Sequence, residues 1–236
     1  MSADAGRKLQ LLCCRIVRLR SQITNLAQDM NQFTNHEIVT FYDVPLVCGA
    51  APTIGCGSRA KPLLMDLERQ AAIEEAWLNR TGTIVAIVWS GPIRAAEVAN
   101  LIFERHEIQY REQRDDKPSS FRKEGSWFRG AGVDRLSLKE AREIAEIGVA
   151  SAVREKLVSG EEAAQIEFEI ERYFREELVK LRTKQELVQD IQDKFPQAII
   201  DIYEKHIGTE KTAQVQAHGI QDPFNRVDSD EGVSCC

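Results

Sequence analysis

The side chains of this sequence that are best suited to chemistry are its thiols. There are six cysteines in 236 residues, and they form three pairs: Cys48 with Cys56, Cys13 with Cys14, and Cys235 with Cys236. Two of these pairs are adjacent in sequence, a spacing that structural disulfides rarely use because the geometry is strained. Free thiols of this kind are soft-metal ligands, redox groups or small apolar residues.

Cys56 has the sequence neighbours that best favour a reactive thiolate. Gly55 and Gly57 flank it, so the backbone there is free to turn tightly and to approach a ligand. A helix is predicted to begin just after it, and Arg59 and Lys61 follow within five residues. Because a helix N-terminus and nearby cations stabilise negative charge, we expect the pKa of Cys56 to be lowered. A thiolate at neutral pH is a nucleophile or a soft-metal ligand.

The segments around Cys56 alternate between strand and helix patterns over residues 36–114. Strand-like runs occupy residues 38–44, 73–78, 83–89 and 108–110, and helical apolar spacing occupies residues 59–69 and 93–105. The order β-α-β-β-α-β predicts an α+β fold with a ferredoxin-like sandwich, in which both helices cover one face of a four-stranded antiparallel sheet. Cys48 and Cys56 then lie in the loop between the first strand and the first helix.

This element order, with a cysteine before the first helix, resembles the heavy-metal-associated (HMA) domain of MerP-like mercury-binding proteins and copper chaperones. The resemblance covers about residues 36–111. The family holds a soft metal in this loop with two cysteines at C-x-x-C spacing; here the first position is Cys56 and the second is Arg59. The resemblance implies binding of Hg(II) or Cu(I), which prefer thiolates, with Cys48 supplying the second ligand where the loop folds back.

The first 35 residues carry an amphipathic pattern. Apolar residues recur every three or four positions, at Leu9, Leu12, Ile16, Leu19, Ile23, Leu26, Met30 and Phe33. Such a heptad seam predicts a helix in residues 1–35 that pairs with a second copy, giving a homodimer, or docks on a partner. The alternatives are a basic helix on a membrane surface and a helix that packs on its own protein. Cys13 and Cys14 border this seam and are expected to be packing residues. Met30 is an alternative start of the chain.

The second half of the chain is predicted to be helical. Residues 115–132 read as a polar linker and residues 133–208 as a helical domain. Capping boxes predict helix starts at Ser137, Ser159 and Thr183. The acidic residues 209–236 read as a flexible tail.

The terminal Cys235–Cys236 pair resembles the thiol tail of mercuric reductase, which passes Hg(II) inward. It also resembles the prenylated end of Rab GTPases, although no phosphate-binding loop accompanies it. Incidental thiols are the third interpretation of this pair.

Composition narrows the class of protein. Hydrophobic residues make up 43% of the chain and charged residues 29%, as in ordinary globular domains. The formal charge of −6 argues against general attraction to nucleic acid. No apolar run approaches the roughly 20 residues of a membrane span, and no secretory apolar region is evident. We therefore expect a cytoplasmic, reducing setting without a transmembrane segment.

These patterns favour a non-enzymatic protein that binds or traffics a soft heavy metal, mercury or copper, through thiolates. The expected ligands are Cys56 and Cys48, with Cys235 and Cys236 as a delivery arm that exchanges the ion with a metal donor or acceptor protein.

Two other functions remain open. In the first, Arg59 marks a degenerate HMA-like domain, and the protein is an interaction or regulatory module whose helical half binds partners. In the second, Cys56 is the nucleophile or redox centre of a thiol enzyme. The enzyme is the least favoured, because no general base is evident; His36 and His106 are the nearest histidines in sequence.

Overall fold

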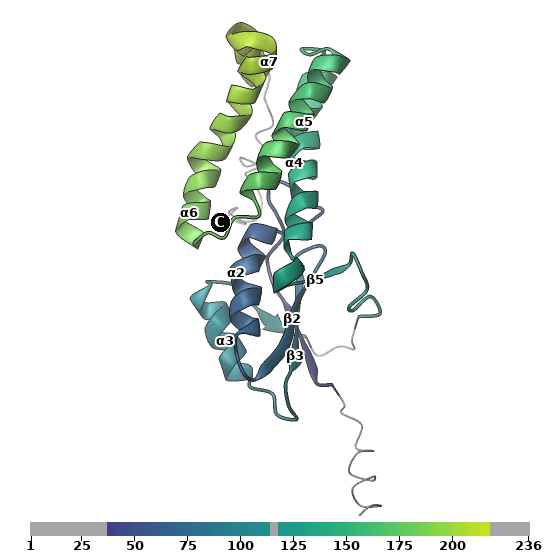
Figure 1. Ribbon diagram of the computed structural model, residues 1–236, viewed down its shortest axis with the longest axis vertical. Coiled ribbons are helices and arrows are strands. Elements are labelled where there is room, and N and C mark those ends of the chain that lie inside the picture. The colour runs from purple at the N-terminus through teal and green to yellow at the C-terminus, as the bar shows by residue number, and fades with distance from the viewer. Residues whose placement is uncertain (1–36, 114–117, 218–236) are drawn as a thin grey trace, which may run out of the picture. The chain divides into compact units, whose positions relative to one another are not determined.

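The computed structural model describes residues 37–113 and 118–217. The helix predicted for residues 1–35 and most of the tail predicted for residues 209–236 lie outside the described residues. The described part is an α+β structure in which an antiparallel sheet is followed by a helical region (Figure 1), as the sequence predicts.

The first half contains five strands and two helices. They are β1 (Val39–Asp43), α2 (Gly57–Glu68), β2 (Ile73–Asn79), β3 (Ile84–Trp89), α3 (Ala96–Arg105), β4 (Arg111–Glu112) and β5 (Trp127–Arg129). The sheet order is β4-β1-β3-β2-β5, and every neighbouring pair is antiparallel. The strands β1 and β3 are rich in β-branched and aromatic residues, which suit a pleated sheet.

The prediction of a four-stranded sheet is wrong, because β5 adds a fifth strand beside β2. This strand lies inside the segment predicted to be a linker. It forms because Trp127 and Phe128, both buried, point to opposite faces of the sheet and extend an apolar cluster on each. The strand predicted at residues 108–110 is also misplaced. Its apolar residue Ile108 is buried in the main core, and the ladder forms three residues later, at β4.

The main core lies between the sheet and the helices α2 and α3. Leu63, Leu64 and Leu67 of α2 are fully buried in it, as is Phe103 of α3. This leucine spacing places one apolar stripe of α2 toward the sheet. Figure 1 shows α2 and α3 next to each other beside the sheet, so the loop that contains the cysteines leads directly into a helix anchored on the core.

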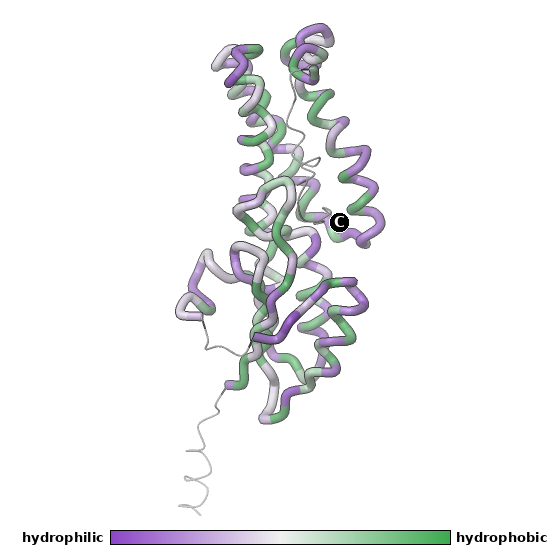
Figure 2. The backbone as a smooth tube through the Cα atoms, turned by 180° about the vertical axis from the view of Figure 1, so that it is seen from behind, coloured by the Kyte–Doolittle hydropathy of each residue, from purple (hydrophilic) through white to green (hydrophobic). Residues whose placement is uncertain are grey.

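The helical region comprises α4 (Asp134–Arg154), α5 (Gly160–Glu177), α6 (Lys184–Gln189), the π-helical turn η2 (Asp190–Lys194) and α7 (Phe195–Ala217). Hydrophobic and hydrophilic positions alternate along these helices (Figure 2), as expected of helices with one buried face. Their buried residues join the same core cluster as the sheet.

Two of the three predicted capping boxes are confirmed. The side chains of Ser159 and Thr183 each accept a backbone N–H at the start of α5 and α6. The box predicted at Ser137 is wrong, because α4 already begins at Asp134 and Ser137 is buried inside it. Glu140, the expected box partner, is turned into the protein interior. None of the helices in the described residues is long and apolar enough to cross a membrane.

Candidate thiol site

The loop between β1 and α2 folds back on itself and brings two thiols together. The Cys48 N–H donates to the Ile54 carbonyl at 2.9 Å, and the Cys56 N–H donates to the Leu46 carbonyl at 2.7 Å. An isolated antiparallel bridge joins Val47 to Gly55 between them. Residues opposite each other in such a pairing point to the same side, so Cys48 and Cys56 lie on one face as diagonal neighbours.

Glycines hold this loop against the rest of the protein. A Cβ added at Gly55 would lie 2.7 Å from the Gly82 Cα in the β2–β3 turn, and Gly82 itself has a φ of 74°. A Cβ added at Gly57 would lie 2.1 Å from the Ser137 Oγ of α4. From the sequence, we expected the glycines beside Cys56 to let the backbone approach a ligand closely. Their close neighbours in the structure are protein atoms, which fix the position of Cys56.

Cys56 is held as a thiolate at neutral pH. The Cys48 thiol hydrogen-bonds the Cys56 sulfur and is the largest cause that lowers the pKa of Cys56 to about 6. Burial opposes this shift, and the Arg59 backbone N–H and guanidinium charge add to it. The same hydrogen bond, together with burial, raises the pKa of Cys48. The lowered pKa was expected from Arg59 and the helix end, whereas the contribution of Cys48 was not.

Glu140 is the third member of the site and was missed in the sequence. It is 1% exposed, and its Oε2 accepts the Gly57 N–H at 3.0 Å. Burial, and then the negative charge of Cys56, raise its pKa well above the usual range, and it hydrogen-bonds both thiols. Among the three groups, the negative charge is therefore favoured on Cys56.

A small cavity lies over the two sulfurs. Its volume is about 40 Å³, which exceeds the roughly 10–15 Å³ that a single water requires. Besides the thiols and Glu140, its lining includes apolar side chains from the helical region: Leu178, Leu187, Val188, Ile191 and Phe195. We call α6 and η2, with the start of α7, the covering segment. It leaves Cys48 5% and Cys56 8% exposed.

An ion-pair cluster holds the covering segment to the end of α5. Arg182 is nearly buried and contacts the Glu177 carboxylate at 2.5 Å and that of Asp190 at 2.6 Å. Lys194 contacts Glu177 at 2.8 Å, and Lys180 also pairs with it. Burial pushes the pKa of Glu177 upward, but its bonds to Lys180 and Lys194 outweigh burial and the pKa is lowered.

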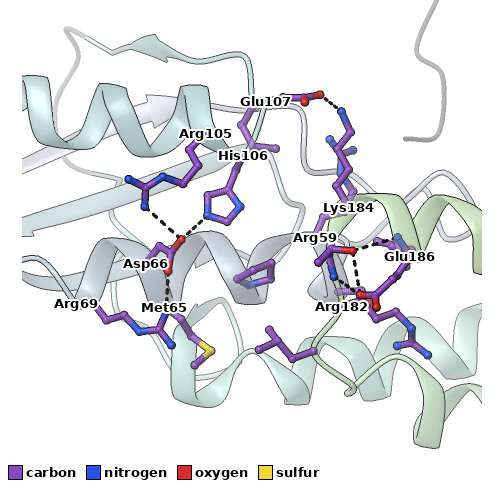
Figure 3. A pocket seen from close by; sticks show the side chains of 16 residues that line it. Arg59, Met65, Asp66, Arg69, Arg105, His106, Glu107, Arg182, Lys184 and Glu186 are labelled. Carbon is purple, nitrogen blue, oxygen red and sulfur yellow. Dashed lines mark hydrogen bonds and ion pairs between the residues drawn. The ribbon is translucent and has the colours of Figure 1, made fainter.

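A larger cavity of about 460 Å³ adjoins the thiol site. It lies between α2, the end of α3 and the start of α6 (Figure 3). Asp66 faces this cavity and pairs with Arg69 and His106 at 2.8 Å and with Arg105 at 3.9 Å. The partner of His106 is thus Asp66, which does not support its use as a base for Cys56.

The remaining candidates, Cys13, Cys14, Cys235, Cys236 and His36, lie outside the described residues. Within residues 37–113 and 118–217, no group of three or more His, Cys, Asp or Glu side chains is arranged to hold a metal ion. Comparison with known proteins finds no matching family model, no matching curated protein and no matching solved structure.

Proposed function

We propose that the protein binds a soft heavy-metal ion, Hg(II) or Cu(I), between the Cys48 and Cys56 thiolates. The observation that supports this most is the pairing of the two sulfurs on one face of the folded-back loop, with Cys56 ionised near pH 6. Thiolates select soft ions of this kind. The cavity over the sulfurs has room for one small ion.

The backbone geometry favours a metal bridge over a disulfide. Diagonal neighbours across an antiparallel pair have Cβ atoms somewhat less than about 7–8 Å apart, whereas a disulfide requires a Cβ separation of roughly 3.5–4.5 Å. A metal ion placed between two sulfurs lengthens the link and tolerates the wider spacing. Both cysteines are free, and we propose a reducing, cytoplasmic setting that keeps them so.

We interpret residues 36–111 as an HMA-like, ferredoxin-like sandwich to which β5 has been added. The order β4-β1-β3-β2 within the sheet, and the position of the thiols between β1 and α2, support this interpretation. In this proposal Cys48 replaces the second cysteine of the C-x-x-C motif, and Arg59 supplies a positive charge beside the thiolates. The function is ligand exchange with a metal donor or acceptor protein, without enzymatic catalysis. Cys235 and Cys236 serve as the delivery arm.

Metal titration tests the proposal. The reference is the full chain in which Cys13, Cys14, Cys235 and Cys236 are changed to Ser, so that only the two site thiols remain. We expect it to bind one Cu(I) or Hg(II) ion in competition with a chelator. Cys56→Ser and Cys48→Ser should each abolish tight binding while thermal unfolding shows that the fold is kept. The unmodified chain then shows whether the tail thiols share the ion.

Two results would contradict metal binding at this site. One is binding by the reference protein no tighter than that of a small free thiol, and the other is unchanged binding after Cys56→Ser. The interaction or regulatory module would then be the better proposal. In that case, replacement of all six cysteines by Ser should leave the capture of partners unchanged.

A further inference from the structure

We propose that the 460 Å³ cavity beside the thiols is an entry site for the metal carried as a complex with a small anionic thiol. This inference rests on the proposed function and names the form in which the ion arrives. A carboxylate-bearing peptide thiol is the chemical class that fits. The volume lies within the range of about 300–1,000 Å³ that small-molecule sites occupy.

The position of this cavity connects it to the thiols. Four residues line both cavities, namely Ser58, Arg59, Lys184 and Leu187. The two cavities therefore adjoin through the side chains of this shared wall, and Cys56 lines the smaller one. Leu187 belongs to the covering segment, so a shift of α6 would join the two spaces.

The charge of the cavity suits an anionic ligand. Its lining has five cationic side chains, Arg59, Arg69, Arg105, Arg182 and Lys184, against three carboxylates, Asp66, Glu107 and Glu186. The cavity lining therefore carries a net positive charge, although the whole chain has a charge of −6. Arg182 is occupied by Glu177 and Asp190, Lys184 pairs with Glu107, and Arg69 pairs with Asp66. Arg59 and Arg105 are therefore the least engaged cations of the cavity wall.

Apart from Arg182, the arginines of the cavity have few carboxylate partners. Arg59 forms no ion pair with any described residue, and its guanidinium donates only a 3.4 Å bond to the Pro45 carbonyl. At the other end, Arg69 and Arg105 share the single carboxylate of Asp66 with His106 (Figure 3). Guanidinium groups bind carboxylates in a two-point geometry. The two ends of the cavity therefore offer separate sites for the carboxylates of one ligand.

The transfer itself is an exchange of thiolates. The Cys56 thiolate bonds to the metal of a two-thiolate complex, and one carrier thiolate leaves. The Cys48 sulfur then bonds to the same ion, and its proton passes to the second carrier thiolate, which leaves as a thiol. One carrier thiolate and one carrier thiol are released, and neither the metal nor the sulfur changes its oxidation state.

Two mercury carriers of different charge test the inference. Hg(II) is supplied to the reference protein either as its bis-glutathione complex, which is anionic, or as its bis-mercaptoethanol complex, which is neutral. The variant is Arg69→Gln with Arg105→Gln, since neither side chain lines the thiol cavity. The matched control is Arg142→Gln with Arg154→Gln, two exposed arginines of α4 away from both cavities.

We expect the cavity variant to load about tenfold more slowly from the glutathione complex at low salt, because steering by charge contributes at least this much to association rates. Loading from the neutral complex should be unchanged, the control should match the reference with both carriers, and about 1 M salt should remove the difference. Equal slowing with both carriers, or none with either, would overturn the entry site while the thiol site stands. Failure of the reference protein to load from either carrier would overturn the proposed function as well.

Discussion

Two buried glutamates next to the covering segment have opposite electrostatic roles. Glu140 of α4 is 1% exposed and Glu177 of α5 is 7% exposed, yet the pKa of Glu140 is raised and that of Glu177 is lowered. Glu140 has two thiols and a backbone N–H as neighbours, whereas Glu177 lies among Lys180, Arg182 and Lys194. Burial favours the neutral acid in both places, so the neighbouring charges decide the outcome.

The comparison separates two kinds of buried polar site. The Glu177 cluster is a set of paired charges that fastens the covering segment. The Glu140 site favours a negative charge on a sulfur and disfavours one on its carboxyl group. A fully paired cluster is suited to structural support, and an unpaired thiolate is suited to binding a cation.

Removal of the central cation of the Glu177 cluster should have the largest effect. Arg182→Met leaves the Glu177 and Asp190 carboxylates near each other without their shared partner. We expect a loss of about 3 kcal/mol in the free energy of unfolding, at the low end for a broken buried pair, because Lys180 and Lys194 remain. Chemical denaturation measures this loss. Arg154→Met, an exposed ion pair on α4, is the control and should change stability by less than about 0.5 kcal/mol. A small effect of Arg182→Met would mean that the cluster does not fasten the segment.

Replacing each of the two glutamates by Gln should also distinguish the two sites, with a smaller difference in the free energy of unfolding. Glu177→Gln removes charged hydrogen bonds and should cost about 2 kcal/mol at neutral pH. Glu140→Gln introduces a neutral amide of the same shape where burial already disfavours the charged carboxylate, and it should cost less than about 1 kcal/mol. Equal costs, measured by denaturation in the same buffer, would remove the distinction between the two sites.

The pH dependence of these variants should run in opposite directions. The contribution of Glu140 is present below its unfolded pKa of about 4.5 and is lost as pH rises toward its raised folded pKa. The advantage of the wild-type protein over Glu140→Gln should therefore shrink above pH 4.5. The contribution of Glu177 is present above pH 4.5 and is lost as pH falls through its lowered folded pKa. Unfolding free energies from pH 3 to 7 test both slopes, and two slopes of the same sign would contradict the assignment.

The smallest expected effect is on the reactivity of the Cys56 thiolate. In the reference protein with two thiols, the alkylation rate of Cys56 should rise with a midpoint near pH 6. Cys48→Ala removes the thiol that bonds Cys56, so the midpoint should move up and the rate at pH 7 should fall by about tenfold. Mass spectrometry of the alkylated peptide measures the rate. An unchanged profile would show that Cys48 does not stabilise the thiolate.

The sequence predicts the local structure of this protein better than its site. Apolar periodicity locates β2, β3 and α2, and the hydroxyl-to-carboxylate spacing locates the starts of α5 and α6, because these features depend on near neighbours. Glu140 was assigned to a capping box because Ser137 stands three residues before it. Its helical spacing from Leu136 and Ile144, both buried, is the signal that places it on the inward stripe of α4.

We expected Cys48 and Cys56 to lie together only if the loop folded back, and no rule based on residue spacing specifies this contact. It depends on the pairing of residues 46–48 with residues 54–56 and on the anchoring of the loop to the β2–β3 turn. The strand β5 was missed for a related reason. It is three residues long, and only its partner β2 makes it a strand. The covering segment joins the site from far along the chain, where local patterns carry no information.

The parts of the thiol site become available at different times during synthesis. The bond from Gly57 to Glu140 spans 83 positions, and the bond from Ser58 to the Leu178 carbonyl spans 120. At about 5–20 residues per second, the cysteines are made roughly 6–24 s before the residues that cover them. Over that interval the new chain presents both thiols to the surrounding solution. Any reaction of these thiols with a metal ion or an oxidant is therefore least obstructed in the newly made chain, before the helices cover them.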